Sequence, residues 1–161
     1  METMEARMVK LYARNNNHVA LHAIPGHFAT SHSHINFYID MTSLKTRANE
    51  AQEVAKSLAG DYVNSTVVDT IVCMDGTEVV GAYLAQEFEK RGFRNTNLHD
   101  TIYVVTPEYN ANNQLIFRDN TIPAIKGKNV ILLLATTTTG LTVRRSLECV
   151  QYYGGTVHGI S

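Results

Sequence analysis

The sequence predicts an α/β protein with an open, mostly parallel, Rossmann-like sheet flanked by helices. Short apolar runs alternate with segments in which apolar residues recur every three or four positions. Strands that alternate with helices are joined by right-handed crossovers, so that the strands lie parallel in one sheet. The six consecutive apolar residues at 130–135 are typical of a strand that is covered on both faces.

The first 45 residues contain the least regular part of this pattern. Apolar residues at one-turn and two-turn spacing predict an N-terminal helix that serves as core or as a subunit contact, and residues 15–17 would end it. The apolar positions of that helix are Met4, Met8, Leu11 and Tyr12. Residues 18–28 and 34–41 are strand-like, Pro25-Gly26 is expected to be a turn, and residues 30–33 form a polar bend.

The following segment begins the regular alternation. An alanine-rich apolar stripe predicts a helix over residues 46–59, with Gly60 as its C-cap. Residues 67–73 form a short apolar strand, and Asp75-Gly76 forms a tight turn. A second helix begins near residue 78 and closes at Lys90, Arg91 and Gly92, where the helix dipole favours positive charge.

The C-terminal part continues the alternation after one interruption. A strand is expected at residues 102–105, followed by a long excursion over 106–128 that contains a small hairpin. The buried strand at 130–135 leads into a polar turn, a helix over 142–153 and a last strand at 156–160. Ligands of open α/β sheets bind at the carboxyl ends of the strands. The loops expected there are residues 74–77, the segment from Thr106 onward and residues 136–142.

Composition excludes several classes of protein. A chain of 161 residues with 44% hydrophobic and 18% charged residues is one globular domain and not a disordered chain. A net charge of −1 gives no basic field for nucleic acid. Cys73 and Cys149 lack C-x-x-C spacing and are expected to be reduced thiols. No apolar run is long enough for a membrane span or a signal core, so we expect a cytoplasmic protein without a membrane partner.

The strongest local signal is the threonine-rich turn that follows the buried strand. It reads Thr136-Thr137-Thr138-Thr139-Gly140-Leu141-Thr142 and leads into a helix. Free backbone N–H groups and the helix dipole make such a helix start an anion site. Hydroxyl groups add neutral donors, and Gly140 allows a phosphate to approach the backbone closely. The alternative is a threonine-rich N-cap without a ligand. No Walker loop and no G-x-G-x-x-G motif is present.

This loop resembles the phosphoribosyl-pyrophosphate (PRPP) motif of the type I phosphoribosyltransferases. That motif is a hydrophobic strand, two acidic residues, two variable residues and then Thr-Thr-Gly-x-Thr, which residues 138–142 match in register. Residues 30–40 resemble a second segment, the "TSG…S..YYID" stretch of orotate phosphoribosyltransferases. The order of helices and strands also fits the family. The resemblance therefore implies one phosphoribosyltransferase-like domain over residues 1–161, with an N-terminal helix and hood-like segment at 1–45 and an α/β core at 46–161.

The resemblance also implies an activity and a set of site residues. Residues 136–142 would hold the 5′-phosphate, while Asp75, Gly76 and Thr77 would form the pyrophosphate loop. Phe37 and Tyr38 would lie by the base. The implied reaction transfers phosphoribosyl from PRPP to a pyrimidine base as Mg²⁺-bound pyrophosphate leaves. The implied partner is a phosphorylated ribose or nucleotide, and the implied assembly is a homodimer.

The sequence departs from the family where charge is concentrated. Leu134 and Ala135 occupy the positions of the two acidic residues that hold the ribose hydroxyls, which puts turnover and Mg²⁺ binding in question. The excursion over 106–128 corresponds by position to the mobile loop of orotate enzymes, and Arg118 is its candidate catalytic cation. Three functions stay open: a divergent orotate-type enzyme, a catalytically degenerate module that binds a nucleotide or phosphate, and, least favoured, a flavodoxin-like mononucleotide binder.

Two other groups of residues are less informative about function. His22, His27, His32 and His34 resemble a metal cluster in the sequence, but solvated loop histidines are the favoured interpretation, and we expect no metal site there. Asp69 lies inside an apolar strand, either at an edge or as a buried, hydrogen-bonded acid.

Overall fold

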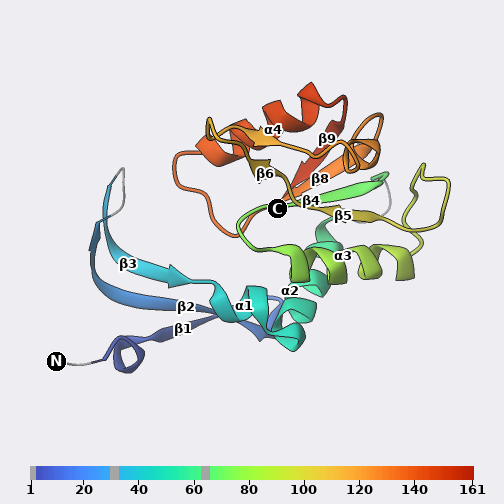
Figure 1. The fold of residues 1–161 in the computed structure, drawn as a ribbon. Coiled ribbons are helices and arrows are strands. Elements are labelled where there is room, and N and C mark those ends of the chain that lie inside the picture. Colours follow the sequence, from blue (N-terminus) through green and yellow to red (C-terminus); the bar gives the residue numbers. More distant parts are fainter. Residues whose placement is uncertain (1–2, 30–32, 63–65) are drawn as a thin grey trace.

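The computed structural model describes residues 3–29, 33–62 and 66–161. In these residues the chain forms a three-stranded antiparallel sheet, a four-stranded sheet and a two-stranded hairpin (Figure 1). The elements are, in chain order, η1 (Glu5–Arg7), β1 (Val9–Ala13), β2 (Asn16–Ala29), β3 (His34–Asp40), α1 (Thr42–Thr46), α2 (Ala48–Asp61), β4 (Thr70–Cys73), α3 (Glu78–Lys90), β5 (Tyr103–Val105), β6 (Glu108–Tyr109), β7 (Leu115–Ile116), η2 (Ile122–Ala124), β8 (Asn129–Leu133), α4 (Leu141–Tyr152) and β9 (Thr156–Ile160).

The central sheet confirms the predicted fold class. Its strands lie in the order β5-β4-β8-β9, and every neighbouring pair is parallel. The apolar run on β8 serves both faces because successive side chains on a strand point to opposite sides. Ile131 and Leu133 join the cluster that packs against α2 and α3. Val130 and Leu132 join a second cluster that includes residues of α4.

Each face of the sheet is therefore closed by helices. On one face the small side chains Ala51, Ala55 and Ala59 of α2 are fully buried and allow this helix to pack closely. On the other face Val150 of α4 and Phe117 belong to the same buried cluster. Within the described part of the chain, no helix is both long enough and apolar enough to cross a membrane.

The predicted N-terminal helix is wrong. Only Glu5–Arg7 is helical, as one 3₁₀ turn, and Val9–Ala13 is a strand that pairs antiparallel with β2. Leu11 and Tyr12 therefore point to opposite faces of a sheet rather than to one face of a helix. The turn between β1 and β2 replaces the predicted helix end. Pairing with a 14-residue strand outweighs the local helical spacing of four apolar residues.

The predicted turn at Pro25-Gly26 is also wrong. Both residues lie inside β2, which runs without interruption from Asn16 to Ala29. The register with β3 shifts between Pro25 and Phe28, so the Pro-Gly pair marks a bulge in a long strand. The predicted bend at residues 30–33 lies largely outside the described residues, because residues 30–32 are not among them.

Two further boundaries differ from the prediction. A separate short helix, α1, precedes α2, and Gly60 lies inside α2 rather than capping it. A Cβ atom at Gly60 would meet no other atom within 4 Å, so this exposed position is free of packing constraints. The strand predicted at 67–73 begins at Thr70, although Val67 forms an isolated bridge with Arg94.

The excursion over 106–128 contains the predicted small hairpin, formed by β6 and β7. Asn110 holds its turn, since the side-chain oxygen accepts hydrogen bonds of 2.9 Å from the backbone N–H groups of Asn112 and Gln114. Asn113 has a positive φ of 58°, which asparagine tolerates better than most residues. A 3₁₀ turn, η2, then leads into β8.

Candidate functional site

Two loops meet at the carboxyl edge of the parallel sheet. One follows β4 and contains Asp75, and the other follows β8 and is the threonine loop, residues 136–142. Together they line a pocket of about 210 Å³, which we call the threonine pocket. The structure thus brings together the whole predicted phosphate loop and the first residue of the predicted pyrophosphate loop.

The threonine loop has the backbone shape that an anion site requires. Gly140 is the N-cap of α4 and has a φ of 75°, in the left-handed region that favours glycine. A Cβ atom at Gly140 would meet nothing within 4 Å, so the space above this residue is open. Residues 136–139 are exposed, and the first N–H groups of the 12-residue helix α4 have no partner within the helix. Donors and the positive end of a helix dipole therefore meet at this position.

The turn after β4 is held in an unusual conformation. Asp75 and Gly76 both have positive φ, at 56° and 77°. Thr77 is buried, and its hydroxyl donates to the carbonyl oxygens of Met74, at 2.8 Å, and Leu133, at 3.2 Å. Thr77 therefore ties the ends of β4 and β8 together, and it does not line the threonine pocket.

Lys45 is a residue of this site that the sequence did not reveal. Its Nζ atom donates a 2.7 Å hydrogen bond to the carbonyl oxygen of Asp75. The same nitrogen lies 3.7 Å from the position that a Cβ atom on Gly76 would occupy. Lys45 comes from α1, 30 residues before the turn, and no local motif indicates that pairing. The contact places a positive charge directly beside the turn that carries Asp75.

The other predicted site residues lie outside the threonine pocket. Arg118, the candidate loop cation, forms an exposed ion pair of 2.8 Å with Glu108 of the hairpin. Phe37 and Tyr38, the predicted base-pocket residues, are half-exposed on β3. The ring of Tyr38 packs against Phe28, with ring centroids 5.7 Å apart.

Leu134 and Ala135 line a second, apolar pocket of about 130 Å³ beside the threonine loop. The rest of its wall comes from α1, α2, α3 and the ends of β8 and β9. The positions that carry acids in the family are therefore part of an apolar surface here. We call this the apolar pocket.

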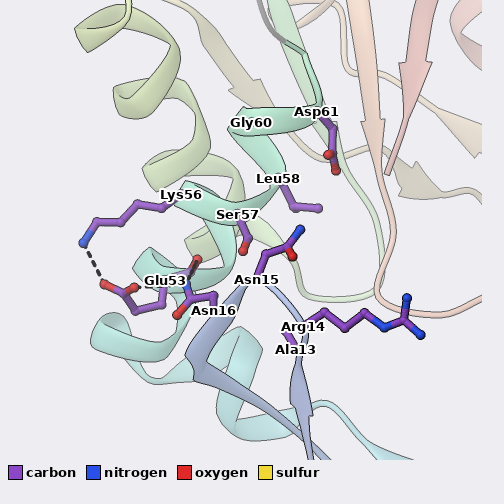
Figure 2. A pocket seen from close by; sticks show the side chains of 10 residues that line it. All are labelled: Ala13, Arg14, Asn15, Asn16, Glu53, Lys56, Ser57, Leu58, Gly60 and Asp61. Carbon is purple, nitrogen blue, oxygen red and sulfur yellow. Dashed lines mark hydrogen bonds and ion pairs between the residues drawn. The ribbon is translucent and has the colours of Figure 1, made fainter.

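A third pocket lies at the turn of the β1–β2 hairpin, against α2, and is wider, with a volume of about 550 Å³ (Figure 2). The carboxylate of Glu53, which lines this pocket, already accepts hydrogen bonds from Lys56 at 2.6 Å and from Asn16 at 3.2 Å. The Arg14 side chain extends away from this pair (Figure 2). The described residues that line this pocket therefore form no cluster of unpaired side chains with the same charge.

Two of the described histidines of this group form a pair. His27 and His34 lie on neighbouring strands with ring nitrogens 2.9 Å apart. Among the residues that the structure describes, no group of three or more His, Cys, Asp or Glu side chains is placed to hold a metal ion. His32 lies outside the described residues.

The two cysteines are not activated nucleophiles. Burial raises the pKa of Cys73 to about 12 and that of Cys149 to about 11, so both stay protonated at neutral pH. Ser146 donates its hydroxyl to the carbonyl oxygen of Thr142, one turn earlier in α4. The described site therefore shows no nucleophile–base pair.

Comparison with known proteins identifies the fold. No protein-family model matches the chain, and neither does any curated protein sequence. Among solved structures, orotate phosphoribosyltransferase of Mycobacterium tuberculosis is similar, at 15% identity and a TM-score of 0.58 over 87% of this chain and 75% of that one. The chain has a type I phosphoribosyltransferase fold.

Two further solved structures support this phosphoribosyltransferase fold. UMP synthase of Leishmania donovani aligns at 16% identity and a TM-score of 0.60, over 86% of this chain but 27% of that one. Adenine phosphoribosyltransferase of Leishmania donovani aligns at 17% identity and a TM-score of 0.57, over 87% of this chain and 62% of that one. The threonine and apolar pockets lie at the strand ends where α/β sheets bind ligands.

Proposed function

We propose that this chain binds the phosphate group of a phosphorylated ribose or nucleotide in the threonine pocket. The observation that carries this proposal is the left-handed Gly140 at the start of α4, with open space above it and exposed threonine hydroxyls on the same loop. Such a loop offers several preorganised donors to one anion. The phosphoribosyltransferase fold supports a ligand of the phosphoribosyl class.

Binding without turnover is the form of this function that the site supports best. A reaction that expels pyrophosphate needs preorganised donors or cations where negative charge develops. Lys45 is beside the turn, but Arg118 is paired with Glu108, and Leu134 and Ala135 present carbon atoms. Ribose hydroxyls placed against those two side chains would lose water without gaining an acceptor. We therefore favour a catalytically degenerate nucleotide- or phosphate-binding module.

Transfer of phosphoribosyl to a pyrimidine base is the second candidate, and the similarity to orotate phosphoribosyltransferase and UMP synthase favours it. Among the described residues that line the threonine pocket, Asp75 carries the carboxylate. Mg²⁺ binds through one or two carboxylates together with ligand phosphates, so Asp75 and a bound pyrophosphate group fit that arrangement. In this candidate, Asp75 would hold Mg²⁺ and the threonine loop would hold the 5′-phosphate.

Calorimetric titration separates the two candidates. PRPP with and without Mg²⁺, orotidine monophosphate, ribose 5-phosphate and inorganic phosphate are titrated into the whole chain, and pyrophosphate release is followed with orotate. Binding of a phosphate ester without release supports the module, whereas Mg²⁺-dependent PRPP binding with release supports the enzyme. If none of these compounds binds, the proposed function is wrong.

A matched pair of variants assigns any binding to the threonine pocket. Gly140→Val places a branched side chain where the phosphate approaches the backbone and is expected to abolish binding. Gly92→Val is the control, because Gly92 also has a positive φ, of 70°, and a Cβ atom there also meets nothing within 4 Å. Both variants carry the same backbone strain, so only loss of the ligand site separates them.

A further inference from the structure

The apolar pocket has a wall made almost entirely of carbon. Its aliphatic lining comes from α1, α2 and α3, from the end of β8 and from residues next to these elements. The apolar side chains are Met41, Leu44, Val54, Leu58, Val80, Leu133, Leu134 and Ala135. Leu44 and Val80 are almost completely buried, at 2% and 4% exposure, so the wall is held firmly by the core.

The polar side chains in this wall already have partners. Thr77 donates to the carbonyl oxygens of Met74 and Leu133. The hydroxyl group of Ser161 is hydrogen-bonded to that of Tyr62. Lys45 donates to Asp75, which leaves its remaining N–H groups at the edge of the pocket. The interior of the pocket therefore suits an uncharged apolar group, while its edge carries a positive charge.

The apolar pocket adjoins the threonine pocket. Ala135 lines the former and its chain neighbour Thr136 lines the latter. Lys45 lines the apolar pocket and is hydrogen-bonded to Asp75, which lines the threonine pocket. One ligand can therefore place an anion on the threonine loop and a neighbouring apolar group against Leu134 and Ala135.

We propose that the two pockets together bind a phosphate monoester whose organic part is an uncharged apolar group of about the size of a benzene ring. The pocket volume of about 130 Å³ supports this size, because an apolar cavity of about 150 Å³ takes up one benzene molecule. This inference rests on the proposed phosphate site and goes beyond the proposed function, because it replaces the ribose next to the phosphate by an apolar group. An aryl phosphate ester binds more tightly than ribose 5-phosphate, because the ring is desolvated against carbon.

The test compares a homologous series of esters by calorimetry. Phenyl, benzyl and 2-phenylethyl phosphate are titrated into the whole chain, beside ribose 5-phosphate and inorganic phosphate. These esters differ in the length of the spacer between ring and phosphate, so the ester that binds most tightly indicates how far apart the two pockets lie. We expect the best aryl ester to bind at least about tenfold more tightly than ribose 5-phosphate, given the apolar area that a ring buries. Gly140→Val should abolish binding of every compound.

Two variants of Ala135 locate the ring. Ala135→Leu fills the pocket with carbon and is expected to remove the advantage of the aryl esters over inorganic phosphate. Ala135→Asp places a carboxylate in the wall and is expected to remove the same advantage by charge rather than by volume. Ala111→Leu, at the exposed tip of the β6–β7 hairpin, is the matched control and should behave as the parent chain. Thermal melting checks that each variant folds.

The outcomes distinguish failure of this inference from failure of the proposed function. If ribose 5-phosphate binds as tightly as every aryl ester, the inference is overturned and the phosphate site stands. If the aryl esters bind more tightly than ribose 5-phosphate but Ala135→Leu does not reduce this difference in affinity, the ring lies elsewhere. The inference is then also overturned. If no phosphate compound binds, the proposed phosphate site fails, and this inference fails with it.

Discussion

Asp69 shows how a single buried charge can organise the base of the sheet. The side chain is fully buried, and its carboxylate accepts from the backbone N–H of Thr96 and from the backbone and side-chain N–H groups of Asn129, the latter at 2.8 and 2.6 Å. Burial by itself would raise the pKa of Asp69, but these hydrogen bonds outweigh it and lower the pKa. The charged form therefore joins β4, β8 and the loop before β5.

The first prediction concerns the pH dependence that follows from Asp69. A carboxyl group whose pKa is lowered on folding stabilises the fold above its unfolded pKa, about 3.9, and loses that contribution as the pH falls through the folded pKa. Asp69→Asn is expected to lower the free energy of unfolding by about 2–3 kcal/mol at pH 7, because it removes charged hydrogen bonds. The loss should shrink below about pH 4. Urea unfolding at pH 7 and pH 3 measures both values, and a pH-independent loss would contradict the assignment.

The second prediction concerns Asp75 in the threonine pocket. Its negative charge opposes an incoming phosphate but provides a carboxylate for Mg²⁺. Asp75→Asn is expected to raise the affinity for inorganic phosphate a few-fold in the absence of Mg²⁺, and to remove any gain in PRPP affinity that Mg²⁺ gives to the parent chain. Asp100→Asn, at an exposed position in the loop before β5, is the control. A Mg²⁺ effect that survives in Asp75→Asn would show that the metal ion needs no protein carboxylate here.

At the scale of elements, close packing of α3 on the sheet depends on Gly81. A Cβ atom at this buried position would lie 2.3 Å from the Sγ atom of Cys73 and 3.2 Å from Cγ1 of Val104. Real Cβ atoms do not approach another atom so closely, so a larger residue must push α3 away from β4. Because Thr77 and Asp75 lie between these two elements in the chain, that displacement would also move the turn at the site.

The third prediction uses this contact. Gly81→Ala is expected to destabilise the chain by about 1–3 kcal/mol through overpacking, although alanine is the better helix former. Adding Cys73→Ala removes the sulfur atom that causes the closest contact, so the double variant should recover part of the stability lost. Thermal melting of the two single variants and the double variant gives the coupling. Simple addition of the two losses would show that the sulfur is not what opposes the new side chain.

Some of the helices and strands could be predicted from the sequence and others could not. Local pattern was sufficient for two helices and three strands. The helices α3 and α4 bury residues at helical spacing, β9 alternates, and β4 and β8 are continuous runs that are buried on both faces. The threonine loop was recognisable because its chemistry is contiguous. The strand β1 was not predictable, because its conformation is set by pairing with β2 across a turn, from Tyr12 opposite Ala20 to Val9 opposite Ala23. Lys45 was missed because its partner Asp75 is brought to it only by the fold.

At the scale of the whole molecule, the three-stranded sheet leaves one apolar face exposed. The register pairs Val9 with Ala23 and Leu11 with Leu21, while Ile39 also pairs with Ala23. Directly paired residues point to the same side of an antiparallel sheet, so these apolar side chains share a face. Val9, Leu11 and Ile39 remain 46%, 54% and 37% exposed. Monomeric proteins rarely leave such a patch open to water, and it is typical of a protein–protein contact.

The fourth prediction is that this face joins two copies of the chain, in keeping with the homodimer that the resemblance implies. Leu11→Glu introduces a charge into the centre of the patch and is expected to convert the dimer to a monomer in sedimentation equilibrium, with the melting transition of the parallel sheet retained. Lys10→Glu is the matched control, because Lys10 is the neighbouring residue of β1 and points to the opposite face. A parent chain that sediments as a monomer at all concentrations would exclude this contact. If the Leu11→Glu variant is still a dimer, the interface lies on another face. The exposed apolar face of the three-stranded sheet would then have a different partner.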